Sequence, residues 1–112
     1  MFDLTVAAPD GRVVQRVELS ERPIRIGRAD DCDVRLGDAR VSRHHAEVRP
    51  LDDAWVFRDL GSTHGSFVQG QRVRELTVAP GLEVRIGPAV LRFDSLAARI
   101  GAELDALLPD ED

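Results

Sequence analysis

The stretch "HAEVRPLDDAWVFRDL", residues 45–60, decides the fold class. Two segments rich in apolar and β-branched residues flank Asp52-Asp53, an acidic pair typical of a tight turn. We therefore predict a β-hairpin, with Ala46, Val48 and Val56 on its core-facing side. Trp55 and Phe57 are interpreted as packing residues of the same hairpin.

Short extended segments continue on both sides of this hairpin. Turn signals at 9–11, Gly70, Pro80-Gly81 and Gly87-Pro88 separate them. The segments themselves are "FDLTVAA" (2–8), "VVQRVEL" (13–19), "PIRIGR" (23–28), "VRL" (34–36), and several more between 66 and 96. Ten or so short strands at this spacing predict an all-β domain over residues 1–96, either an antiparallel sandwich or a barrel.

The segment 97–112 has a different pattern. Apolar residues there fall on one helical stripe, and an acidic "PDED" ends it; the stripe consists of Leu96, Ile100, Leu104, Leu107 and Leu108. We expect a short C-terminal helix docked on the sandwich, or a linker tail.

Length, charge and composition argue against several classes of protein and partner. A chain of 112 residues is suited to one domain. A net charge of −5 argues against a nucleic-acid or membrane partner. All basic residues are arginine, which is compatible with a GC-rich bacterial source. Cys32 is the only cysteine, so no internal disulfide can form. No apolar run has the length of a membrane span. We therefore expect a cytoplasmic protein.

Two polar clusters frame the hairpin, "VSRHH" at 41–45 and "GSTHG" at 61–65. A hairpin returns the chain to the end from which it started, so both clusters must lie at the same end of the domain. Ser42, Arg43, Ser62 and Thr63, with the backbone N–H groups of a glycine-rich turn, form a set of hydrogen-bond donors. Such a set matches a phosphate oxyanion.

Two chemical alternatives were weighed against this interpretation. Ser42 and His45 could form a nucleophile and base, but no strand–turn–helix setting and no orienting third residue is evident. His44, His45 and His64 could bind a metal, but adjacent strand residues point to opposite faces. We therefore expect no metal, no cofactor and no enzymatic activity.

The ordered set Gly27-Arg28, "SRHHA" (42–46), "GSTHGS" (61–66) and Gly70 resembles a forkhead-associated (FHA) domain, from about Pro23 to Phe93. The resemblance implies a β-sandwich of eleven strands that binds phosphothreonine in a partner protein. It also implies signal transduction, with a Ser/Thr protein kinase substrate as the partner and a monomeric module. The alternative is an FHA-like scaffold that binds partners without phosphate, through a sheet face.

The resemblance also implies a role for individual residues. It implies that Arg28 and Ser42 bind the phosphate, that Arg43 adds a donor, and that Thr63 touches the phosphothreonine beside its methyl pocket. Arg28 is included because of the resemblance alone. The segment "VRL" (34–36) is too short to assign a strand direction, so the residue pattern does not place Arg28 at the end of the domain where the two clusters lie. His64 stands where the family usually has asparagine. The predicted phosphopeptide-binding residues are Arg28, Ser42, Arg43, Ser62, Thr63 and His64, and the predicted loop supports are Gly27, His45, Gly65 and Gly70.

Overall fold

The central hairpin forms as predicted, except that Val56 lies opposite Arg49 and outside the core cluster, while Phe57 takes the core-facing position opposite Val48. In the computed structural model, which describes residues 2–95, β5 (Ala46–Leu51) pairs antiparallel with β6 (Ala54–Asp59). The register runs from Ala46 opposite Asp59 to Leu51 opposite Ala54. Asp52 takes a positive φ of 55°, a conformation that aspartate tolerates in tight turns.

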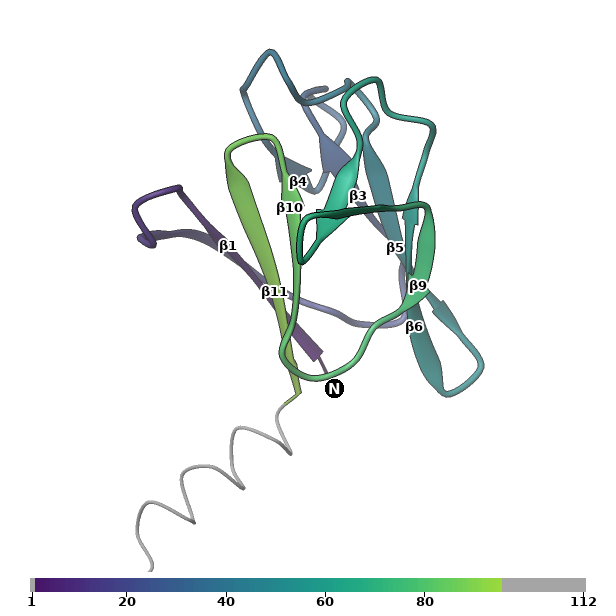
Figure 1. The fold of residues 1–112 in the computed structure, drawn as a ribbon. Helices are drawn as coiled ribbons and strands as arrows, with labels where there is room; N and C mark the ends of the chain where they lie inside the picture. Colours follow the sequence, from purple (N-terminus) through teal and green to yellow (C-terminus); the bar gives the residue numbers. More distant parts are fainter. Residues whose placement is uncertain (1, 96–112) are drawn as a thin grey trace, which may run out of the picture.

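The described residues form eleven strands in two sheets, which confirms the predicted all-β sandwich (Figure 1). The six-stranded sheet has the order β2-β1-β11-β10-β7-β8, and the five-stranded sheet has the order β4-β3-β5-β6-β9. The other strands are β1 (Phe2–Ala7), β2 (Val13–Glu18), β3 (Ile24–Gly27), β4 (Val34–Arg35), β7 (Ser66–Val68), β8 (Gln71–Val73), β9 (Glu75–Thr77), β10 (Leu82–Ile86) and β11 (Ala89–Ser95).

Alternation along the strands fills the space between the sheets. In β10, Val84 and Ile86 are buried while Glu83 and Arg85 are exposed, as a two-residue period requires. Phe57 is fully buried and Trp55 packs against the core, as predicted. The core comprises Leu4, Val6, Leu19, Ile24, Ile26, Val34, Val41, Ala46, Val48, Phe57, Val78, Val84, Ile86, Ala89, Leu91 and Phe93.

The loops gather at one end of the sandwich. The loops 28–33, 36–45 and 60–65 lie at the upper end in Figure 1, and the β5–β6 turn lies at the opposite end. Within the described residues, the structure holds no helix that is long and apolar enough to cross a membrane. The expected C-terminal helix or tail at 97–112 lies outside the described residues.

Candidate functional site

Arg28 is positioned by backbone pairing between two loops. Its N–H donates to the Ser42 carbonyl at 3.0 Å, and the next residue, Ala29, donates to the Arg43 carbonyl at 3.0 Å. The guanidinium Nε then donates to the Val41 carbonyl at 3.1 Å. This last bond fixes the direction of the side chain and leaves the two terminal nitrogens available to a ligand.

Gly27 makes this close pairing possible. A Cβ built on Gly27 would collide with the backbone carbonyl of Arg43, and it would lie 3.0 Å from the backbone nitrogen of His45. The close approach of two backbones therefore requires glycine at this position.

The buried side chain of His45 connects the first polar cluster, to which it belongs, with the second. It is fully buried, its Nδ1 accepts from the Ser42 N–H at 3.1 Å, and its Nε2 lies 2.9 Å from the Gly65 carbonyl. These partners assign the neutral tautomer with the proton on Nε2. Burial lowers the pKa of His45, outweighing the hydrogen bond to Gly65 and the charge of Asp59, which both act to raise it.

The Ser42 side chain forms a second connection between the two clusters. Its hydroxyl oxygen accepts from the Thr63 N–H at 3.1 Å, so the two loops are in direct contact, as the hairpin geometry predicts. Gly65, at the end of the second loop, has a φ of 88°, and Gly70 has a φ of 79°. Both values lie in the left-handed region, which glycine adopts at little cost in tight turns.

Asp59 organises the second loop, a role that the sequence did not reveal. Its carboxylate accepts from the Ser62 N–H at 2.8 Å and from the hydroxyls of Ser62 and Ser66 at 2.7 Å each. Burial acts to raise the pKa of Asp59, but the hydrogen bonds from Ser62 and Ser66 outweigh it and hold the pKa below its ordinary value. Hydrogen bonds to a buried, charged carboxylate therefore hold the second loop in place.

Ser62 lies away from the predicted ligand-binding surface. It is only 5% exposed, and its hydroxyl both donates to Asp59 and accepts from the Gly65 N–H at 2.9 Å. The sequence shows a serine in a donor-rich loop but cannot show that Asp59 turns its hydroxyl inward. A signal existed in the spacing, since an aspartate often caps backbone N–H groups two and three residues later.

Five of the six predicted site residues line one pocket of about 300 Å³. They are Arg28, Ser42, Arg43, Thr63 and His64, joined by Ala39 and Val41. No acidic residue lines this pocket, although the whole chain carries a net charge of −5. Guanidinium groups, a hydroxyl and an exposed imidazole around a small cavity form a receptor for a multiply charged oxyanion.

The geometry excludes Ser42 and His45 as a nucleophile and its base. His45 Nδ1 is bonded to the Ser42 backbone N–H, not to the hydroxyl, and Nε2 faces the Gly65 carbonyl. With both ring nitrogens engaged, His45 cannot accept the hydroxyl proton.

A second cluster next to this pocket has the donor types of a metal site. Asp31, Cys32 and His44 bring their ligand atoms within 4.8 Å of one another, a juxtaposition that the sequence analysis did not foresee. His44 Nε2 lies 2.9 Å from an Asp31 oxygen, and the Cys32 thiol donates to the Arg43 carbonyl at 3.3 Å. Burial raises the pKa of Cys32, which disfavours the thiolate that a metal requires. Three arginines, Arg28, Arg35 and Arg43, line the adjoining surface, and we assign no ion to the cluster.

The chain is similar to known proteins over most of its length. The FHA domain family model matches residues 24–87, more than half of the chain. The FHA domain-containing protein FhaB of Mycolicibacterium smegmatis is 39% identical over 79 residues, which cover 70% of this chain and 51% of that protein. The chain thus spans about half the length of this curated relative.

Two solved structures are similar throughout the sandwich. The crystal structure of the FhaA FHA domain complexed with the intracellular domain of Rv3910 has a TM-score of 0.71 and 33% identity, covering 83% of this chain and 99% of that one. A structure from an analysis of phosphothreonine-dependent FHA domain interactions has a TM-score of 0.71 and 33% identity, covering 84% and 95%. With the family model, these likenesses establish the identity of the domain: the chain belongs to the forkhead-associated (FHA) domain family.

Proposed function

We propose that this domain binds phosphothreonine in a partner protein, through the pocket between the loops 36–45 and 60–65. The observation that carries the proposal is the convergence of Arg28, Ser42, Arg43 and Thr63 on one cavity that has no acidic lining residue. A phosphothreonine near neutral pH carries up to two negative charges and three acceptor oxygens, which this donor set complements.

Each residue has a distinct role in the proposal. Arg28 places its terminal nitrogens on the phosphate, since Nε is already held by the Val41 carbonyl. The Ser42 hydroxyl, which accepts from the Thr63 N–H, still has its own proton to donate to a phosphate oxygen. Arg43 supplies a second cation, and the Thr63 side chain borders the methyl group of the ligand. Ser62 acts as a loop support, because its hydroxyl is engaged with Asp59 and Gly65.

The proposed partner is a substrate of a Ser/Thr protein kinase, because such kinases create phosphothreonine. The domain has a binding role and no catalytic role of its own, which fits a signalling module in the cytoplasm. One of the similar structures comes from work on phosphothreonine-dependent FHA interactions, and this supports the same ligand class here.

A screen against a phosphothreonine peptide library tests the proposal, with each peptide also present in unphosphorylated form. The proposal requires that binding depend on the phosphate and weaken in Arg28→Ala. If phosphorylated and unphosphorylated peptides bind equally, the domain is a phosphate-independent scaffold and the proposal fails.

A further inference from the structure

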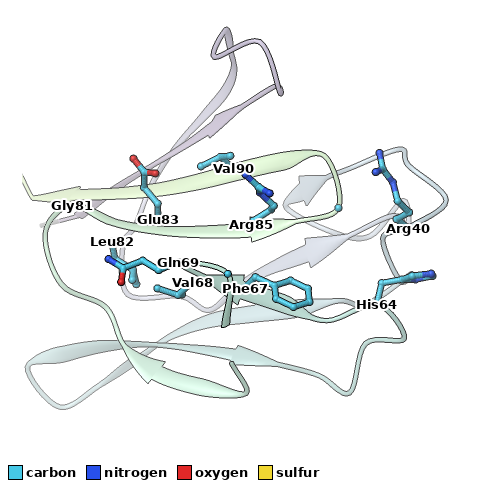
Figure 2. Close-up of a pocket in the computed structure, with 12 residues that line it drawn as sticks. Arg40, His64, Phe67, Val68, Gln69, Gly81, Leu82, Glu83, Arg85 and Val90 are labelled. Atoms are coloured by element: carbon cyan, nitrogen blue, oxygen red, sulfur yellow. The ribbon is translucent and has the colours of Figure 1, made fainter. Parts of the chain in front are cut away.

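A groove leads away from the phosphate pocket along the outer face of the six-stranded sheet. It has a volume of about 720 Å³ and shares His64 with the phosphate pocket. In Figure 2, Arg40 and His64 lie at one end of the groove, and Leu82, Glu83 and Gln69 lie toward the other. The two cavities therefore meet at one side chain, and a ligand in the first can continue into the second.

Strand alternation determines which side chains of three neighbouring strands line this groove. Val84 and Ile86 point into the core, so Arg85 points outward, and Val90 on β11 is its cross-strand partner. Phe67 on β7 is the partner of Arg85 on the other side. The pairing therefore sets one row across three strands, in the order Val90, Arg85, Phe67. Val68 and Leu82 are half-buried residues that pack against the core and also line the groove.

Among the described residues that line the groove, Arg85 is the charged side chain that has no partner. Within residues 2–95, neither the Arg85 side chain nor the His64 side chain has a hydrogen bond or an ion pair, whereas the Arg40 side chain is paired with Asp38 at 3.0 Å. Glu83, the acidic residue of the lining, faces Arg92 at 3.4 Å. An occupant must therefore offer apolar side chains to Phe67 and Val90 and a carboxylate to Arg85.

The length of the groove fits an extended peptide segment. It follows β10 from Gly81 to Gly87, six residue steps or about 20 Å at the rise of a β-strand. An extended chain of about six residues covers this span. The groove is also continuous with the proposed phosphate pocket, since His64 lines both cavities.

We propose that this groove binds the segment of the partner that continues from its phosphothreonine, and that it selects leucine-like side chains together with a carboxylate. The inference rests on the proposed function, and it adds a second, sequence-selective surface to it. Its ligand class is a phosphopeptide with an apolar and acidic extension of about six residues.

Fluorescence anisotropy with matched peptides tests the inference. The reference is a short peptide centred on phosphothreonine. The test peptides add Leu-Leu-Glu-Glu-Leu-Leu on either side, and the control peptides add Ser-Ser-Glu-Glu-Ser-Ser. In an extended chain each face of the leucine peptide presents two leucines and one glutamate, so the side chains offered to the groove do not depend on which face meets it.

The leucine extension on one side should tighten binding about tenfold relative to the short peptide, and the serine extension should not. Val90→Glu should abolish this gain, because the new carboxylate stands opposite Arg85 and adds charge to the apolar floor. The short peptide should bind Val90→Glu as it binds the wild type. Val14→Glu is the matched control, since Val14 is 56% exposed on β2 and does not line the groove.

Equal affinities for the short, serine-extended and leucine-extended peptides would overturn the inference and leave the proposed function intact. A gain that persists in Val90→Glu would also overturn it, by placing the contact elsewhere. A concentration-dependent dimer that Val90→Glu abolishes would show that a second copy of the chain occupies the groove. Failure of every phosphopeptide, short ones included, would instead refute the proposed function.

Discussion

Replacing His45 by alanine should destabilise the fold far more than replacing its neighbour His44. His45 is 0% exposed and bonds the Ser42 N–H and the Gly65 carbonyl. Its removal leaves the buried Gly65 carbonyl and the part-buried Ser42 N–H without this partner, at up to about 1–3 kcal/mol each, so we expect a loss of about 2–5 kcal/mol. A domain of this size has about 5–15 kcal/mol in total. His44 is 47% exposed and contacts Asp31 at the surface, and its loss should cost about 0.5 kcal/mol or less.

Urea denaturation of both variants at neutral pH measures this difference. The midpoint for His45→Ala should fall steeply, while the slope with urea stays constant and the midpoint for His44→Ala stays close to that of the wild type. Similar midpoints for the two variants would refute the assignment of His45 as the link between the loops.

The pH dependence of stability gives an independent check on the same residue. Burial holds the pKa of His45 below its ordinary value of 6.5. The unfolded chain then binds the proton more tightly than the folded chain does, so stability is fully present above pH 6.5 and decreases as the pH falls from there toward the folded pKa. Asp59 also has a lowered pKa, but its contribution is lost only below its ordinary value of 3.8. The loss of stability just below pH 6.5 should therefore be smaller in His45→Ala than in the wild type, and identical profiles would contradict the buried neutral imidazole.

Two further predictions concern the loops and the ligand. In a urea titration, Gly27→Ala should lower the free energy of unfolding by more than about 2 kcal/mol, because the new Cβ meets the Arg43 carbonyl. Gly37→Ala is the control and should be nearly neutral, because the space around its Cβ is open. Equal effects of the two substitutions would contradict the close approach at Gly27. A phosphothreonine peptide should bind more tightly than the same peptide with phosphoserine, by about 1–3 kcal/mol in calorimetric titration, if Thr63 and its neighbours enclose the methyl group; equal affinities would indicate a general anion site.

The sequence predicted the fold class because its strands carry their own signals. The hairpin at 45–60 has an alternating core face and an acidic turn, and these two features set both the register and the end at which the loops meet. The convergence of Ser42 and Thr63 followed from that hairpin alone, and the structure joins them by a hydrogen bond of 3.1 Å.

Other parts of the site could not be derived from local patterns. Arg28 reaches the pocket because the segment 27–29 pairs with 41–43, a non-local contact that no periodicity encodes, and only the family resemblance suggested it. The inward orientation of Ser62 depends on where the Asp59 carboxylate is held. The outer groove depends on the pairing of β7 with β10, two strands that are distant in sequence.

Calorimetric titration of one phosphothreonine peptide into the wild type and Arg28→Ala tests the central claim most directly, with the unphosphorylated peptide as the control. Truncating one partner of a close charge pair costs about 2–5 kcal/mol, so Arg28→Ala should bind at least about 30-fold more weakly. Its urea midpoint should stay near that of the wild type, because the Arg28 side chain is exposed and contributes to the pocket, not to the core. The unphosphorylated peptide should not bind detectably to either protein. Unchanged affinity in Arg28→Ala, or equal binding of the two peptides, would contradict the account.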